Sequence, residues 1–178
     1  DLAEPITSCL VFLATLIDKT SQIKLASGVI NMPSYHPVHV AAQVAMMDHL
    51  LDGRFLMGIG PGGLPSDIEV FGNLDLDKNE KMVEAIDQVL AIWSGEPPYS
   101  LEGKHYRTST ERTLYPEIGQ GIVKTPLQLP HPPIVFTALA PYSKGITAAA
   151  ERGWTGVSSN YVQDHWVATH IPKFLEGQ

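Results

Sequence analysis

Hydrophobic residues along this chain fall into short runs of strand length that alternate with longer stretches of helical spacing. The strand-length runs lie at 23–30, 54–59, 134–138 and 154–158. The helical stretches lie at 3–16, 37–52, 79–94, 143–152 and 162–175, the last expected to stop at Pro172. Strand, helix and strand in this order form βαβ units, which give a parallel sheet with right-handed crossovers. The pattern therefore predicts an α/β fold whose informative loops follow the strands.

Two capping signals and one irregular segment complete this pattern. Ser66 with Glu69 has capping-box spacing and predicts a short helix that ends near Gly72, and Asp77 with Glu80 repeats the signal before the 79–94 helix. Between 96 and 133 prolines cluster and the periodicity fails, with short strands expected around 104–107 and 121–124. A loop of that length is usually a lid or a binding insertion.

Composition narrows the classes of function. The chain has 178 residues, 44% of them hydrophobic and 17% charged, which is typical of a globular domain. A net charge of −7 without any basic run argues against nucleic acid or an anionic membrane as partner. The single cysteine, Cys9, cannot form an internal disulfide and is predicted to be a core residue. Acidic residues precede the apolar run around Cys9, where a signal peptide would need positive charge, and this run is too short to cross a bilayer. We therefore predict a cytoplasmic protein.

The glycine-rich loop after the second strand has more than one interpretation. Gly58, Gly60 and Gly63 match the dinucleotide fingerprint, but Pro65 breaks the helix that a Rossmann site needs at this point. The preferred interpretation is that the glycines let the backbone approach a flat ring or its phosphate tail closely. A tight turn without any ligand is the remaining alternative.

Other candidate residues lie in loops after strands. The loop 140–145 leads into a helix, whose amino-terminal N–H groups favour a phosphate and where a serine hydroxyl adds a donor, although Ser143 can equally be a plain helix cap. His36 follows the first strand and can act as a general acid or base, or cap the next helix. No histidine has acid or cysteine ligands at zinc spacing, so we predict no metal. Asp48 and Arg54 lie at the opposite face of the sheet and are predicted to be structural.

An ordered set of motifs carries a family resemblance. The motifs are GVxNxPxxHP at 28–37, DHLxxGRF at 48–55, GIGxGxLPxDxxxFG at 58–72, EAIDQVLAIW at 84–93, PPYSLEGKHY at 97–106, TALAPYSKG at 137–145 and AAAERGW at 148–154. In this order they resemble the bacterial luciferase-like flavin monooxygenases over nearly the whole chain. Luciferases proper carry Cys-Arg where this chain has Gly60-Pro61, so luminescence is not expected.

The resemblance implies a (β/α)₈ TIM barrel of the luciferase-like type. Such a barrel takes about 250 residues, so we expect residues 1–178 to form one partial barrel domain with a lid-like insertion at about 96–133. The implied activity is a monooxygenase that uses oxygen and reduced FMN, delivered by a separate flavin reductase, on a small, largely apolar organic substrate. An F420-dependent dehydrogenase and a non-catalytic flavin-binding protein are the alternatives.

The resemblance also implies a site and an assembly. The predicted catalytic residue is His36, and the predicted cofactor-binding residues are Gly28, Val29, Asn31, Gly60, Ala138, Tyr142 and Ser143. In the family a bulge, often with a non-prolyl cis peptide, lies against the flavin ring, and we expect it between Gly28 and Val29. Helices 3–17 and 37–52 are expected to form a homodimer interface.

Overall fold

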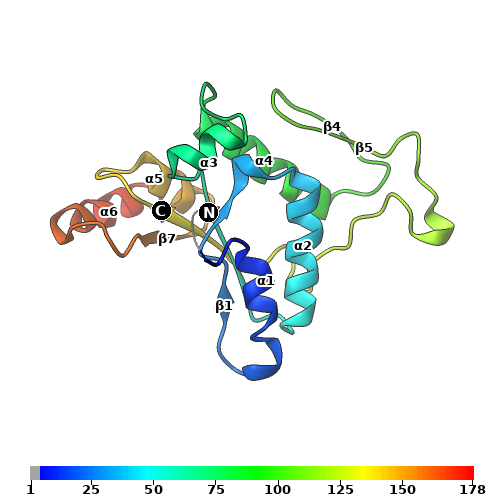
Figure 1. The fold of residues 1–178 in the computed structure, drawn as a ribbon, viewed down its shortest axis with the longest axis horizontal. Helices are drawn as coiled ribbons and strands as arrows, with labels where there is room; N and C mark the ends of the chain where they lie inside the picture. The colour runs from blue at the N-terminus through cyan, green and yellow to red at the C-terminus, as the bar shows by residue number, and fades with distance from the viewer. Residues whose placement is uncertain (1–4) are drawn as a thin grey trace.

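The computed structural model describes residues 5–178 and is built on a curved, parallel sheet (Figure 1). Its strands are β1 (Leu25–Ala26), β2 (Ile30–Asn31), β3 (Phe55–Gly60), β6 (Ile134–Ala138) and β7 (Thr155–Ser158). β1 and β2 both pair with β3 on one side, while β6 pairs with its other side and β7 pairs with β6. The predicted parallel α/β sheet is therefore confirmed, as an incomplete barrel.

Helices cover the outside of this sheet, and a small hairpin extends from it. The helices are α1 (Cys9–Ala14), α2 (Pro37–Leu50), α3 (Pro65–Val70), α4 (Lys78–Ser94), α5 (Lys144–Glu151) and α6 (Asp164–Glu176). Short 3₁₀ helices are η1 (Ile17–Lys19), η2 (Met32–Ser34) and η3 (Pro116–Ile118), and the hairpin joins β4 (Ser100–Glu102) to β5 (Arg107–Ser109). Figure 1 shows α5 and α6 beside β7 on the left and the hairpin at the far right.

Three predicted helix boundaries need correction. The first helix begins at Cys9, because Ser8 is extended and its hydroxyl accepts the Val11 amide; residues 3 and 4 of the prediction lie outside the described residues. α3 begins at Pro65, whose fixed φ suits the first helical position, so Ser66 is not the cap. α6 continues through Pro172, which lies on its exposed side. By contrast, Asp77 caps α4 as predicted.

The predicted strand 23–30 is interrupted by a bulge. Leu25 and Ala26 pair with Phe55 and Leu56, but Ile30 pairs with Ile59, so three residues face two across the break. The buried Ser27 hydroxyl donates to the Gly58 carbonyl (3.1 Å) and accepts from the Gly58 amide (2.9 Å). The Gly28–Val29 peptide inside the bulge is cis, which confirms that expectation.

The hydrophobic core lies between β3 and the two long helices α2 and α4. Phe55, Met57 and Ile59 of β3 have no exposed surface, and apolar stripes of both helices pack against them. Trp93 of α4 adds a polar link, because its indole N–H donates to the Ala41 carbonyl of α2 over 3.2 Å. Burial of each large side chain stabilises the fold by about 1.5–3 kcal/mol. This core fixes the carboxyl ends of the strands, where the loops of the candidate site begin.

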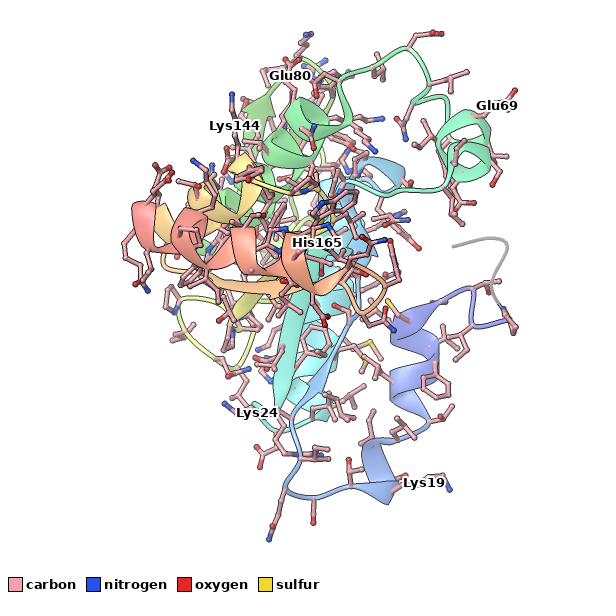
Figure 2. All side chains as sticks on the ribbon, turned by 90° about the vertical axis from the view of Figure 1, so that its left-hand side faces the viewer. Lys19, Lys24, Glu69, Glu80, Lys144 and His165 are labelled. Carbon is pink, nitrogen blue, oxygen red and sulfur yellow. The ribbon has the colours of Figure 1, made fainter. Side chains whose placement is uncertain are left out.

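The amino-terminal face of the sheet is held by the two residues predicted to be structural. Asp48 is fully buried, and its carboxylate accepts the backbone and side-chain N–H groups of Gln128 at 2.7 and 2.6 Å. Arg54 donates to the carbonyls of Thr20 and Ile23. Figure 2 shows Lys19 and Lys24 in the lower part of the molecule, at this face, and Glu69 of α3 in the upper part.

The segment 96–133 is ordered differently from the prediction. β4 and β5 pair antiparallel around a turn at 103–106, and no strand forms at 121–124. The reason is Glu84 of α4, whose carboxylate accepts the backbone amides of Lys104, His105 and Tyr106 at 2.7 to 3.1 Å. Because these amides donate to Glu84, they cannot take part in a β-ladder, and the turn is fixed to α4.

Glu84→Gln is expected to destabilise the protein by about 2–3 kcal/mol, because three amides lose a charged acceptor. Urea unfolding followed by circular dichroism measures this change. Glu102→Gln is the matched control, since Glu102 pairs with Arg107 at the surface and its loss should change stability by less than about 1 kcal/mol. Equal effects of the two substitutions would contradict this account of the hairpin.

Candidate functional site

A cavity of about 790 Å³ opens at the carboxyl ends of the parallel strands. Its walls come from the bulge, the β2–α2 loop, the glycine loop after β3, and the ends of β6 and β7, together with the segment that leads into α1. The lining residues include Cys9, Gly28, Val29, Asn31, Tyr35, Gln43, Gly60, Gly62, Asp67, Thr137, Leu139 and Tyr161. In a parallel α/β sheet this edge is where ligands bind.

One wall of the cavity depends on two glycines. A Cβ on Gly60 would lie 3.2 Å from a methyl group of Val29, so a larger residue there would crowd Val29. Gly62 has a φ of +77°, and a Cβ there would lie 3.4 Å from Cγ of Asn31. The two glycines therefore add no side chain next to Val29 and Asn31.

The cavity carries little charge. Among the described lining residues Asp67 is the single carboxylate, and none is Lys or Arg. Burial raises the pKa of the Cys9 thiol, so it is held neutral. The pKa of Tyr35 is raised as well, first by burial and then by the neighbouring Cys9. The wall therefore offers apolar surface and neutral hydrogen-bonding groups.

Four of the predicted cofactor residues meet at this cavity: Gly28, Val29, Asn31 and Gly60. Ala138 does not line it, although its neighbours Thr137 and Leu139 do. Side chains of a strand alternate between its two faces, and Ala138 is buried on the same side as Ile134 and Phe136. β6 thus reaches the cavity through Thr137 and Leu139, and the cofactor role of Ala138 stays a prediction.

Tyr142 and Ser143 are held outside the cavity lining. The Tyr142 amide donates to the Thr169 hydroxyl of α6 over 2.9 Å, and Ser143 makes no side-chain cap bond to α5. Next to Thr169, the buried His170 bridges the Ala140 carbonyl and the Ser158 hydroxyl. Because a carbonyl can only accept, Nε2 of His170 carries a proton. The loop is thus fixed by α6, and its phosphate-binding role stays a prediction.

His36 occupies the cap position that was the alternative to catalysis. Its Nδ1 accepts the Val38 amide at 3.3 Å, and its Nε2 lies 3.2 Å from the Arg107 carbonyl of the hairpin. Its ring also meets Tyr106 edge to face. The adjacent Ser34 and Tyr35 line the cavity and His36 does not. These contacts support capping, and a catalytic role stays a prediction.

Tyr106 connects the hairpin to the loop beside the cavity. Its hydroxyl donates toward the carbonyls of Pro33 (3.3 Å) and Met32 (3.4 Å). Burial, with a smaller contribution from the charge of Glu84, raises the pKa of Tyr106 to about 12. No residue of 96–133 lines the cavity, so this segment braces the site from outside, and its predicted lid role remains untested.

Sequence reasoning missed two parts of the lining. Ser159, Asn160 and Tyr161 follow β7, and the rule that loops after strands carry sites was sufficient to find them. The stretch 5–10 leads into α1 and includes its first two residues, and it had no such signal. Cys9 packs against the core, as predicted, and also lines the cavity.

Within residues 5–178 no group of three or more His, Cys, Asp or Glu side chains is placed to hold a metal ion. Over the same range no helix combines the length and hydrophobicity needed to span a bilayer. His165 illustrates the first point, because it lies on the exposed first turn of α6 (Figure 2).

Comparison with known proteins decides the family. The model of the family described as luciferase-like monooxygenase matches residues 3–173. The chain belongs to this family. Limonene 1,2-monooxygenase from Rhodococcus erythropolis is 38% identical over 93 residues, which cover 52% of this chain and 24% of that protein.

Solved structures agree on the fold. The oxygenating constituent of 3,6-diketocamphane monooxygenase from Pseudomonas putida, in complex with FMN, matches with a TM-score of 0.81 and 24% identity. An F420-dependent secondary alcohol dehydrogenase matches with a TM-score of 0.74 and 19% identity. The matches cover 97% and 96% of this chain but 49% of each structure, so the chain spans about half of the luciferase-like barrels it resembles.

Tyr106 is expected to make stability fall at alkaline pH. Its pKa rises from 10.0 to about 12 on folding, so the neutral hydroxyl stabilises the folded state fully below pH 10. That contribution is lost as the pH rises through about 12, where the phenolate would face two carbonyls. Urea unfolding between these pH values should therefore show a steeper decline for the wild type than for Tyr106→Phe. Tyr161→Phe, at an exposed position, should keep the wild-type slope. A wild-type slope in Tyr106→Phe would refute the assignment.

Proposed function

We propose that this chain is part of a flavin-dependent monooxygenase that uses reduced FMN and oxygen on a small organic substrate. The observation that carries the proposal is the side-chain-free wall of Gly60 and Gly62 beside Val29 and Asn31. It lies at the carboxyl edge of a luciferase-like half barrel, and such a surface fits a flat ring.

The residues present fit the ring end of FMN. Val29 and Gly60 would orient the ring by contact, Asn31 offers an amide beside it, and the apolar lining would exclude water. Reduced flavin, when bound, supplies the electrons that activate oxygen. For the phosphate end we retain Tyr142 and Ser143 before α5, although a phosphate would there displace Thr169 from the Tyr142 amide.

The lining also favours a substrate class. A substrate that lacks charge loses little hydration on entering a cavity with one carboxylate and no cation among its described lining residues, whereas an organic anion would meet no partner. We therefore propose an uncharged, largely apolar substrate. The similarity to a limonene monooxygenase supports this class.

We propose two alternative functions and one partner protein for the same site. A deazaflavin such as F420 presents a similar ring, and an F420-dependent dehydrogenase shares the fold, so this cofactor is the second candidate. A flavin-binding protein without turnover is the third. A separate flavin reductase is proposed as partner, because one structural relative is named as the oxygenating constituent of its enzyme.

Gly60→Val is expected to weaken FMN binding at least tenfold, because its side chain would occupy the surface beside Val29. Anaerobic titration of the chain with reduced FMN, and in parallel with reduced F420, measures the affinities. Ala148→Val on the exposed face of α5 is the control and should bind as the wild type does. Tighter binding of F420 would favour the second candidate, and failure to bind either cofactor would overturn the proposal.

We also propose a homodimer through α1 and α2. Val11 and Phe12 of α1 and Met46 and Leu50 of α2 are 44–68% exposed, and the two helices lie side by side in Figure 1. Large apolar side chains gathered on neighbouring helices are typical of an interface.

Val11→Asp combined with Met46→Asp is expected to convert the dimer into monomers, because the two substitutions place like charges in the proposed interface. Light scattering after size-exclusion chromatography reports the mass. Val70→Asp, at a residue of α3 that is 67% exposed, should leave the dimer intact. A wild-type chain that elutes as a monomer would disprove the interface.

A further inference from the structure

Two lysines occupy an electrostatically poor position at the start of α4. Lys78 is the first residue of the helix and Lys81 the fourth, where the positive end of the helix dipole disfavours cations. Burial lowers the pKa of Lys81, while Glu84 opposes this shift to a smaller extent. The helix dipole therefore gives no reason for lysine at these two positions.

Lys78 is bonded to the glycine loop. Its ammonium group donates to the carbonyl of Gly62 over 2.9 Å. Gly62 lies next to the Asn31 side chain, since a Cβ built on Gly62 would be 3.4 Å from Cγ of Asn31. A charge-assisted bond from α4 thus holds the backbone that forms one half of the cavity wall.

Lys81 reaches the other half through one intermediate residue. Its ammonium donates to Oδ1 of Asn73 over 2.6 Å, and Nδ2 of Asn73 donates to the Pro33 carbonyl over 3.2 Å. Asn73 is only 2% exposed, so both of its polar atoms need these partners. Lys81 also lies 5.3 Å from the centre of the Tyr106 ring, whose hydroxyl bonds to the same carbonyl.

We propose that Lys78 and Lys81 are positioning residues that set the spacing between the β2–α2 loop and the β3–α3 loop. Both loops are tied to the first turn of one helix, and α4 is itself fixed in the core by Ile86, Val89 and Trp93. The position of Gly62 next to Asn31 is then held from α4, and neither lysine lines the cavity. The consequence for a flavin ring rests on the proposed function, whereas the bracing of the loops does not.

The test compares Lys78→Met and Lys81→Met with the conservative Lys78→Arg and Lys81→Arg. Methionine keeps the length of the side chain and removes the donor, and arginine keeps charge and donors. Lys104→Met is the matched control. This substitution removes the same charge next to α4, but Lys104 pairs with Glu80 at the surface and bonds to neither loop through its side chain. Hydrogen–deuterium exchange of the amides in 31–36 and 60–64 is measured without ligand, and reduced FMN affinity and the bound-flavin spectrum are measured on the same samples.

Both methionine variants should speed exchange in their own loop about tenfold and weaken FMN binding by a similar factor, as loss of a charge-assisted bond implies. The arginine variants should recover most of both effects, and Lys104→Met should match the wild type. A lower melting temperature with wild-type loop exchange in both methionine variants would reduce the lysines to a general structural role and overturn the proposal. If the wild type binds no flavin, the proposed function fails, and the exchange data still decide whether the lysines brace the loops.

Discussion

The close approach of Ser27 to Gly58 is the contact on which the site depends. A Cβ on Gly58 would overlap the Ser27 carbonyl oxygen, so any side chain there would push the first strand away from β3. With glycine present, the Ser27 hydroxyl replaces the ladder by bonding to both backbone groups of Gly58. The chain can then leave the sheet for three residues and rejoin it, and this excursion carries Val29 to the cavity.

The rest of the molecule supports that excursion from two directions. In the core, the buried residues of β3 pack with the apolar stripes of α2 and α4. Next to the cavity, polar groups of α4 and of the β4–β5 hairpin hold the loops. The Glu84 carboxylate fixes the hairpin turn, and the Tyr106 hydroxyl donates to the Pro33 carbonyl. Apolar packing sets where the strands end, and directed hydrogen bonds set the course of the chain beyond those ends.

Periodicity was enough to predict the elements whose burial follows a single pattern. β3, β6, α2 and α4 appear within about two residues of their predicted bounds, because each is a clear apolar run or helical repeat of the expected length. The beginning of α1 was wrong because the Ser8 cap starts the helix later than the apolar spacing indicates. The hairpin was displaced because Glu84, some twenty residues away, holds its turn. Such contacts between distant positions leave no local periodicity.

The candidate site was predictable to the level of the strand end and not to the individual side chain. Glycine marks a close backbone approach and the family motif covers this stretch, which is why Gly28, Val29, Asn31 and Gly60 were predicted, and all four line the cavity. Ala138 does not line it, because its place in the alternation of β6 turns it to the other face, and the cofactor role of all five residues stays a prediction. The bonds of the Tyr142 amide and of His36 come from tertiary partners, Thr169 and Arg107, that the sequence alone does not bring near.

The bulge also changes how this strand can be exchanged between proteins. Because three residues face two, Leu25 and Ile30 pair with Phe55 and Ile59 on the same face, although one position is odd and the other even. Suppose that a segment from another barrel without the bulge replaces part of this strand, residue for residue, with its boundary inside 27–29. The side chains on one side of the boundary would then point to the wrong face of the sheet. In chimaeric barrels the stretch 25–31 is therefore a single cassette, to be transferred together with the glycine at position 58 that accommodates it.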